Sequence, residues 1–180
     1  MTKTKIFALA TAARPIAFAN PPVAALAGST FWVCATPQQS DLTGTAYAAL
    51  TWVQVKGVGS FTATGNKTNI LSFMEWETDV LQKTKGITNA GDPILEVARI
   101  STDPGQIIMR SICLTKFNYA FKIIRGDLPT GIGASATTIY NRGIVNGPLR
   151  PNGKTEDFDL EMYDLALNQR EIVVEPVVGT

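Results

Sequence analysis

Residues 48–115 constrain the fold of this chain more than any other stretch, because strand, turn and helix signals follow one another there. Residues 50–55 contain a tryptophan and two valines and are typical of a β-strand. Residues 89–92 combine asparagine, glycine and aspartate and predict a turn, after which residues 94–100 predict another strand. A helix start at residues 101–106 follows directly. These signals favour a mainly β domain with a helix packed beside it.

The helix start is the clearest single signal in the chain. Asp103 is a favoured N-cap residue, and Pro104 suits the first helical position because its missing N–H would have no partner there. Gln106 lies three residues after the cap, where its side chain can reach back as in a capping box. The apolar residues that follow share one helix face: Ile108, Met109, Ile112 and Cys113. We therefore expect a helix that ends near residue 115 and covers an edge or end of the sheet.

Glycine and proline divide the other segments into short runs, several of which predict strands. These runs are residues 31–34, 117–124, 137–145 and 158–174. Residues 60–69 are small and polar and predict a loop, whereas residues 70–81 alternate in the way a strand does. We expect an antiparallel β-sandwich or barrel-like domain with one flanking α-helix.

The first 46 residues differ from the others because they are rich in alanine, threonine and proline. Four prolines in this stretch exclude a long helix. We interpret residues 1–46 as an extended N-terminal arm with a first short strand, and residues 47–180 as a single β-sandwich domain. Several apolar side chains of the arm are poorly suited to water: Ile6, Phe7, Leu9, Ile16 and Phe18. We expect them to be buried on the protein's own domain or on a neighbouring subunit.

The composition argues against catalysis and against binding of nucleic acid. The chain has no histidine, so it lacks the commonest general base and the commonest metal ligand. A net charge of +1 provides no basic field for phosphates. Cys34 and Cys113 lie in apolar runs and are interpreted as free, buried thiols. The charged fraction of 17% is below the usual value of about 25%, as expected for a surface covered by other copies, although a sparsely charged monomer has the same composition.

The charges are unevenly distributed along the chain. Residues 1–74 contain one acid, Asp41, whereas residues 156–175 contain seven acids and one base, Arg170. Opposite charge at the two ends could align subunits, and an accidental distribution is the alternative.

Two groups of acids are the candidates for a functional surface: Asp157, Asp159 and Glu161, and Glu75, Glu77 and Asp79. If each group lies on a strand, its members share one face. The first group lacks the glycine turn and distant glutamate of a calcium loop, and a glycosidase pair would need carboxylates across a cleft. We predict no catalytic residue, metal or cofactor, and a solvated strand face is the simplest interpretation. Trp32, Trp52 and Trp76 are interpreted as core residues.

The signals at residues 52–57, 83–86, 91–92 and 103–106 also follow a familiar order. A strand rich in tryptophan and valine comes first, then a lysine-glycine segment, a Gly-Asp turn and an Asp-Pro-Gly-Gln helix start. This order resembles that of the major tail tube proteins of long-tailed (siphovirus-like) phages and related tail-like particles. Residues 1–46 lie outside the match.

The resemblance implies a structural subunit that forms hexameric rings, which stack into the phage tail tube of the virion. Arms and loops would bridge the rings, and assembly would take place in the host cytoplasm without a membrane. The tube would hold the tape measure protein and then conduct double-stranded DNA without specific binding, and tail terminator and distal tail proteins would complete the tail. The two groups of acids would then face the lumen and repel phosphates.

Other interpretations remain open at this point. The inner tube of a contractile tail or of a secretion system shares the expected architecture. A secreted carbohydrate-binding β-sandwich would need an exposed tryptophan platform and a signal peptide. Residues 1–13 are similar to a signal peptide, but Arg14 and Pro15 interrupt the apolar stretch. A hydrolase would have to use Asp157, Asp159 or Glu161.

Overall fold

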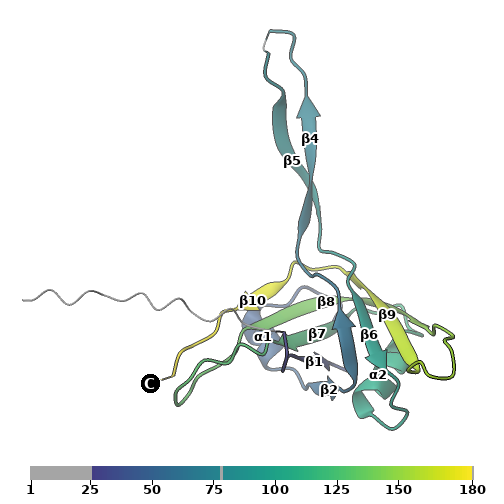
Figure 1. The fold of residues 1–180 in the computed structure, drawn as a ribbon. Coiled ribbons are helices and arrows are strands. Elements are labelled where there is room, and N and C mark those ends of the chain that lie inside the picture. The colour runs from purple at the N-terminus through teal and green to yellow at the C-terminus, as the bar shows by residue number, and fades with distance from the viewer. Residues whose placement is uncertain (1–25, 78, 180) are drawn as a thin grey trace, which may run out of the picture.

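The computed structural model describes residues 26–77 and 79–179, which form a mainly β fold (Figure 1). The elements are β1 (Thr30–Val33), α1 (Gly44–Ala48), β2 (Val53–Val55), β3 (Val58–Phe61), β4 (Lys67–Phe73), β5 (Gln82–Asn89), β6 (Ile94–Ala98), α2 (Pro104–Ile112), β7 (Tyr119–Ile124), β8 (Thr138–Leu149), β9 (Leu160–Leu167) and β10 (Ile172–Val174). All paired strands are antiparallel. The predicted antiparallel β domain with a flanking helix is confirmed.

The body of the protein is one eight-stranded sheet that folds over on itself. Its strand order is β2-β1-β7-β8-β9-β6-β3, and β10 pairs with β8 outside this path. The first half of β8 pairs with β7 and β10, whereas its second half pairs with β9. Phe31 of β1 and Phe61 of β3 belong to opposite parts of the path, yet their ring centroids are 5.4 Å apart. The fold is therefore a sandwich whose two layers share β8.

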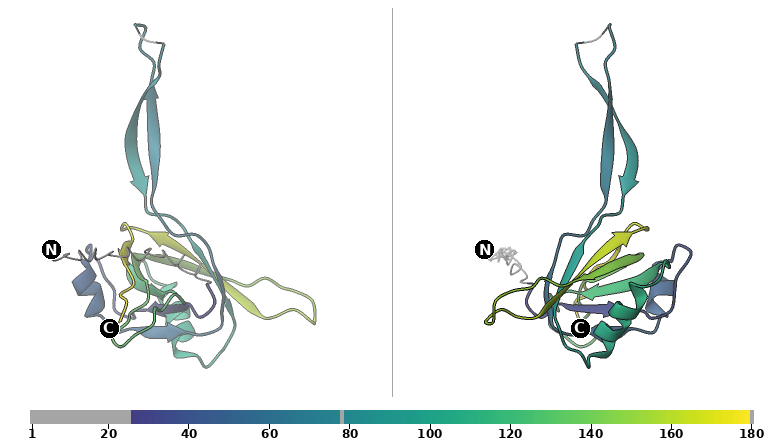
Figure 2. Two further views of the ribbon diagram at one scale, coloured as in Figure 1. Left: turned by 60° about the vertical axis from the view of Figure 1, so that its left-hand side comes forward. Right: turned by 90° about the vertical axis from the view of Figure 1, so that its right-hand side faces the viewer.

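Alternation along the strands fills the space between the two layers with apolar side chains. Phe31 and Val33 of β1 and Leu95 and Val97 of β6 point inward, and Phe121 stacks on Phe31 at 5.9 Å. Helix α2 lies against β1, β2 and β8 and contributes Met109 and Ile112 to this core. The helix thus closes one end of the sandwich (Figure 2).

A second, smaller cluster lies on the outer side of β7 and β8. Tyr47 of α1 stacks on Tyr140 at 5.0 Å, and Trp52 packs beside them. The sequence did not predict α1, because a five-residue helix is too short to show a helical period. Lys122 lies over the half-buried rings of Trp32 and Trp52, at 4.7 and 5.0 Å from their centroids.

The start of α2 is hydrogen bonded to the ends of two strands, β2 and β6. Asp103 is the N-cap residue, and its carboxylate accepts a hydrogen bond of 2.9 Å from the backbone N–H of Gln106. The Gln106 side chain does not reach back to the cap as a capping box would require. Its Oε1 accepts from the N–H of Ile100, and its Nε2 donates to the carbonyls of Lys56 and Ala98 at 2.8 and 2.9 Å. The buried side-chain amide of Gln106 thus provides hydrogen-bond partners for backbone groups at the ends of β2 and β6 and joins both strands to the helix.

The N-terminal part of the chain is more integrated than the sequence indicates. Strand β1, the short strand expected within residues 1–46, lies between β2 and β7 inside the sheet. The arm residues Ile6, Phe7, Leu9, Ile16 and Phe18 lie outside the described residues. Cys34 and Cys113 are free thiols, and Cys34 is buried.

Candidate functional site

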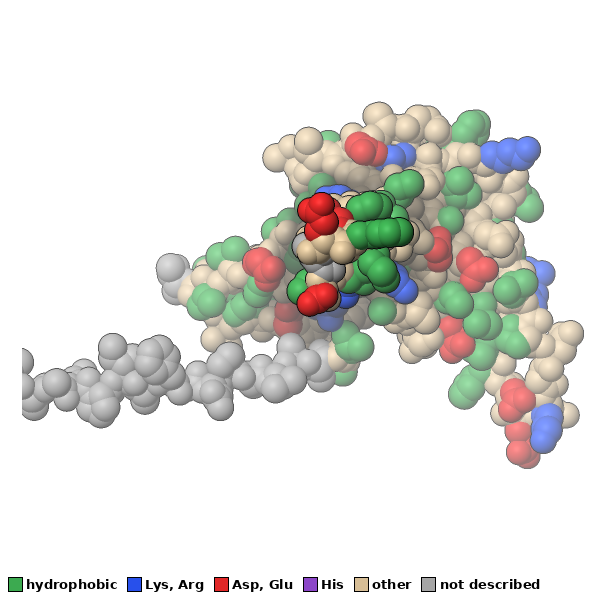
Figure 3. All heavy atoms as spheres, turned by 90° about the horizontal axis from the view of Figure 1, so that it is seen from above, with side chains coloured by type: hydrophobic (Ala, Val, Ile, Leu, Met, Phe, Trp, Pro, Cys, Tyr) green, Lys and Arg blue, Asp and Glu red, His purple; other side chains and the backbone are tan. Residues whose placement is uncertain are grey.

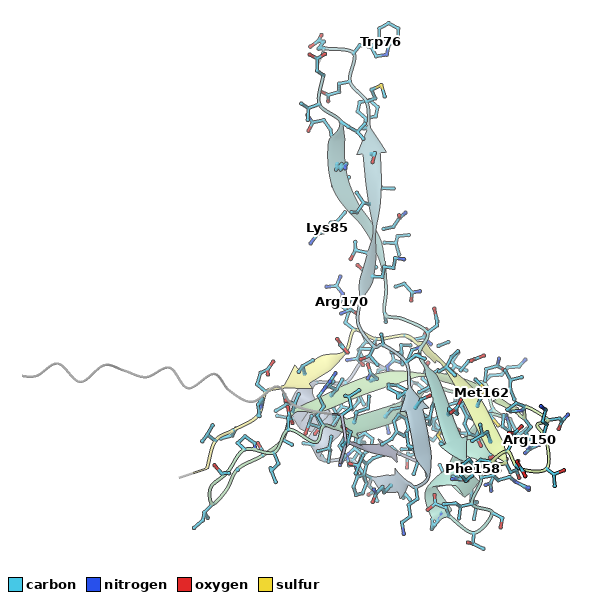
Figure 4. The ribbon with its side chains drawn as sticks, in the orientation of Figure 1. Trp76, Lys85, Arg150, Phe158, Met162 and Arg170 are labelled. Atoms are coloured by element: carbon cyan, nitrogen blue, oxygen red, sulfur yellow. The ribbon has the colours of Figure 1, made fainter. Side chains whose placement is uncertain are left out.

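Strands β4 and β5 form a hairpin that projects away from the body (Figures 1 and 2). The two strands pair only with each other, and the hydroxyls of Thr68 and Thr88 are hydrogen bonded across the pair at 2.8 Å. Arg170 of the body donates to the Thr88 hydroxyl at 3.3 Å at the root of the hairpin. Figure 4 shows Trp76 at the far tip, Lys85 along the stalk and Arg170 at the root. We call residues 67–73 and 82–89 the stalk and residues 74–81 the tip.

The prediction that residues 70–81 form one strand is wrong, because β4 ends at Phe73 and the chain then turns. Glu75, Glu77 and Asp79 therefore lie at the tip and not on one face of a strand. The period-2 alternation of apolar and acidic residues misled the interpretation, since an exposed turn tolerates the same alternation. The predicted loop at residues 60–69 also contains strand residues at both of its ends.

The hairpin exposes an unusual amount of apolar surface. Trp76 is fully exposed, so its interpretation as a core residue is wrong. Other exposed apolar side chains of the hairpin are Ile70, Leu71, Phe73, Met74, Val80, Leu81 and Ile87. A two-stranded sheet is at best marginally stable in water, and contiguous apolar patches mark interaction sites. The hairpin is thus suited to being covered by another molecule.

Charge separates sharply along the hairpin. The tip contains Glu75, Glu77 and Asp79 and no basic residue, whereas the stalk contains Lys67, Lys83 and Lys85 and no acidic residue. None of these six side chains forms an ion pair within the described part of the chain. Figure 3, which views the molecule from above, shows hydrophobic side chains on one side of the tip and acidic ones toward the other.

Glu161 does not belong to a solvent-facing acid cluster. Its side chain is fully buried, because the alternation of β9 places it on the same inward side as Tyr163 and Leu165. Arg110 donates to its carboxylate at 2.9 Å and Arg150 at 3.1 Å, and the Tyr163 hydroxyl donates at 2.8 Å. Arg99 lies 3.5 Å from the same carboxylate. As a residue of the lumen surface, Glu161 was predicted wrongly.

The surroundings of Glu161 fix its protonation state. Burial by itself raises the pKa of its carboxyl, but hydrogen bonds from Arg110, Tyr163 and Arg150 outweigh burial and hold the pKa below its ordinary value. Burial and the adjacent carboxylate raise the pKa of Tyr163. Glu161 is therefore ionised and serves to join β6, α2, β8 and β9.

The other two acids of this group lie in different places. Asp157 is in the β8–β9 loop and accepts a hydrogen bond from the N–H of Lys154 at 2.7 Å. Asp159 precedes β9 and pairs with Arg99 at 3.2 Å, with 60% of its side chain exposed. The three acids therefore do not line one face of a strand.

Two acids that the sequence interpretation missed do share a face. Strands β3, β6 and β9 contain no lysine or arginine, and their acids are Glu96, Glu161 and Asp164. Glu96 lies between the buried Leu95 and Val97, and Asp164 lies between the buried Tyr163 and Leu165, so both point outward. Register places Ile94 opposite Asp164 and Glu96 opposite Met162, which makes the two acids diagonal neighbours. We call this outer side of β3, β6 and β9 the acidic face.

The described part of the chain offers neither a metal site nor a membrane-spanning helix. In residues 26–77 and 79–179, no group of three histidine, cysteine, aspartate or glutamate side chains could hold a metal ion. No helix within these residues is long and apolar enough to cross a membrane. A hollow of about 630 Å³ lies near the hairpin root and is lined mainly by polar residues such as Asn89, Asn168 and Gln169.

Comparison with known proteins shows relatives by fold only. No family model matches the chain, and no curated protein matches it. A chain in the cryo-EM structure of the anti-feeding prophage (AFP) cap, its tube terminating cap, has a TM-score of 0.57 and 13% identity over 93% of this chain and 99% of that chain. A chain in the 6-fold symmetrised AFP baseplate has a TM-score of 0.53 and 10% identity over 82% of this chain and 91% of that chain. This protein shares the fold of those two chains.

Proposed function

We propose that this protein is a structural subunit of a phage-tail-like particle and that it polymerises as stacked hexameric rings into a tube. The carrying observation is the projecting hairpin with its exposed apolar side chains. An exposed apolar surface of this size is suited to burial against another molecule. The body of the same copy does not bury it, because the hairpin extends away from the body (Figure 1). The fold likeness to chains of a prophage baseplate and tube cap supports the same conclusion.

The free sheet edges also support association between copies. Strands β2 and β3 end the path of the sheet, so each has one side without a strand partner among the described residues. Unpaired strand edges invite pairing with other chains, and closure of a ring removes them. Both strands are short, with three and four residues, which limits uncontrolled pairing of the free subunit.

A tube made of this subunit would conduct double-stranded DNA most easily if the acidic face lined the lumen. Glu96 and Asp164 would then repel phosphates, and no basic side chain of β3, β6 or β9 would hold them. The tape measure protein would occupy the lumen first, and tail terminator and distal tail proteins would bind the tube ends. Assembly would take place in the host cytoplasm and the product would belong to the virion.

The proposed role is structural and not enzymatic. The chain has no histidine, and its most enclosed acid, Glu161, is held by three arginines and a tyrosine inside the fold. The inward position of Glu161 removes one of the three acids that a hydrolase could have used. The exposed Trp76 stands at the end of a narrow hairpin and does not form a flat platform for sugars with Trp32 or Trp52, which are half-buried in the body.

A second candidate function is a ring-forming cap or baseplate component. The extent of the likeness to the chain of the AFP tube terminating cap, over 93% of this chain, favours it. Such a subunit would form rings that do not stack into long tubes. The inner tube of a contractile tail or of a secretion system would instead assemble as the main proposal describes.

Electron microscopy of the purified protein at rising concentration tests the proposal. We expect rings and hollow tubes from the natural sequence, and their loss on Trp76→Glu, which places a charge in the apolar tip. Leu128→Glu is the matched control, since Leu128 is also an exposed apolar residue but lies outside the hairpin. Rings without tubes would favour the cap or baseplate role, and a strict monomer at high concentration would contradict the proposal.

A further inference from the structure

The stalk presents two of its three lysines, Lys83 and Lys85, on one face together with the apolar Ile70. Register places Lys85 opposite Ile70, Lys83 opposite Ser72 and Lys67 opposite Asn89. Alternation along β4 puts Ile70 and Ser72 on one side, so their partners Lys85 and Lys83 share that side, whereas Lys67 and its partner Asn89 are on the other side. The register shift between Thr68 and Ile70 interrupts the alternation of β5 beyond Lys85. Ile70 is 62% exposed. We call the side of the stalk with Lys83, Lys85 and Ile70 the lysine face.

The tip offers the complementary chemistry. Glu75, Glu77 and Asp79 provide three carboxylates, and Met74 and Trp76 provide exposed apolar surface beside them. The tip has three acids and no base, and the lysine face has two lysines and no acid. Both halves of a complementary contact are therefore present on one hairpin.

A single copy leaves these charges unpaired. Tip and stalk follow one another along the same extended hairpin, and no ion pair among the described residues joins them. A second copy can place its tip beside this stalk, which pairs the opposite charges and covers the apolar side chains together. Association between oppositely charged surfaces is also selective, because a wrong register would place like charges side by side.

We propose that the hairpin tip of one copy docks on the lysine face of a second copy's hairpin. This inference rests on the proposed function, since it names the surface through which copies of the assembling subunit meet. The tip acids face Lys83 and Lys85 of the second copy, and the apolar tip side chains cover Ile70.

Such a contact joins two different surfaces and can therefore propagate. A copy whose tip docks on a second copy still offers its own stalk to the tip of a third copy. Head-to-tail repetition of this kind produces an open series, as a stack of rings requires. Two hairpins that dock reciprocally would instead form a closed pair and stop.

Two charge-reversed variants test the contact. In the tip variant, Glu75→Lys, Glu77→Lys and Asp79→Lys are combined, and in the stalk variant, Lys83→Glu and Lys85→Glu are combined. Each variant places like charges at the contact, so we expect its critical concentration for assembly to rise at least about tenfold. An equimolar mixture of the two variants restores opposite charges between copies, so we expect assembly to return. Sedimentation velocity and electron microscopy measure both effects.

A control variant carries the same change of charge as the stalk variant, but on the body. Lys116→Glu and Lys154→Glu replace two exposed lysines outside the hairpin and should leave assembly unchanged. Circular dichroism checks that every variant is folded. Assembly of both hairpin variants at the natural critical concentration, or a folded mixture that does not assemble, would overturn the inference.

The outcomes for the contact and for the tube are distinguishable. If the natural protein and the mixture both form only dimers, the tip-to-stalk contact is supported and the proposal of a tube is contradicted. If the natural protein and both hairpin variants form tubes equally well, the proposal of a tube is supported and the tip-to-stalk contact is contradicted. If the lysines bind DNA instead, the stalk variant loses DNA binding and its assembly is unaffected, which also contradicts the inference.

Discussion

At the scale of single residues, the most informative side chain is Glu161, whose carboxylate is buried among three arginines. Arg99 follows β6, Arg110 is in α2 and Arg150 follows β8, so one carboxylate joins three elements to β9. A buried charge is costly unless it is paired and fully hydrogen bonded. In this protein three arginines pair with the carboxylate, and Glu161 thereby fixes the relative positions of the elements at this end of the sandwich.

We predict that Glu161→Gln destabilises the protein by about 1–3 kcal/mol, because it removes the charge that compensates the arginines while keeping the shape. The estimate is below that for a fully buried pair because Arg99 and Arg150 are 45% and 53% exposed. Urea denaturation measures the free energy of unfolding. Asp159→Asn is the control and should change it by less than about 0.5 kcal/mol, since that pair is at the surface. Equal effects of the two substitutions would contradict the prediction.

The natural protein and Glu161→Gln should also differ in how their unfolding free energies depend on pH. The pKa of Glu161 is lower in the folded state than in the unfolded state. Its stabilising contribution is therefore fully present above the unfolded pKa and is lost as the pH falls through the folded pKa. The difference in unfolding free energy between the natural protein and Glu161→Gln should shrink when urea titrations are repeated below about pH 4.

At the scale of elements, the hairpin and the body differ in what holds them together. The body has a core on the inner side of the folded sheet, whereas β4 and β5 contact mainly each other. The hydrogen bond between Thr68 and Thr88 marks the point where the hairpin leaves the body. The stalk and tip therefore add surface for binding and little to the stability of the fold.

We predict that the body folds normally without the hairpin. Residues 69–87 would be replaced by an Asn-Gly turn, which suits a two-residue hairpin connection between Thr68 and Thr88. The unfolding free energy should change by less than about 1 kcal/mol, because loop closure depends only weakly on loop length. Assembly should be lost, as seen by sedimentation velocity. A loss of stability above about 2 kcal/mol would mean that the hairpin belongs to the core.

At the level of the whole molecule, the positions of the acids in space differ from what their order along the sequence suggests. The acids of residues 156–175 do not form one charged end. Glu161 is buried, Asp164 is on the acidic face, and one carboxylate oxygen of Glu171 is buried. Asp41, the one acid of residues 1–74, pairs with the buried Arg142. Folding thus replaces a gradient along the chain with separate surfaces of different charge.

We predict that Glu96→Lys combined with Asp164→Lys leaves tube assembly intact but makes the tubes retain DNA. Lysines in the lumen would attract phosphates where the natural acids repel them. Short duplex DNA held there should be protected from nuclease, which a digestion assay measures at low and high salt. Glu156→Lys combined with Glu175→Lys changes two exposed acids outside this face and should give no protection. Equal protection by both variants would contradict a lumen position of the acidic face.

Several elements could be predicted because their signals are local. Asp103 and Pro104 start α2, since an N-cap and a first-turn proline depend only on neighbouring backbone. The alternation at residues 94–98 and the core position of Trp52 follow from side-chain size and apolarity. The short α1 and the second function of Gln106 were missed because neither has a period or motif of its own. Gln106 meets Lys56 only after the sheet has formed.

The mainly β class, the flanking helix and the separation of charge between residues 74–81 and the lysines around them can be read from the amino-acid sequence alone. Local backbone preferences and composition are sufficient for each of these. Which acids are buried, which are outside and which are at the tip of a projecting hairpin depends on how distant parts of the chain pack together. Glu161 and Glu96 have similar neighbours along the chain, but the fold turns one toward three arginines and the other toward solvent. The physical reason is that the inward side of a strand is set by the layer it packs against, and that layer comes from distant parts of the chain.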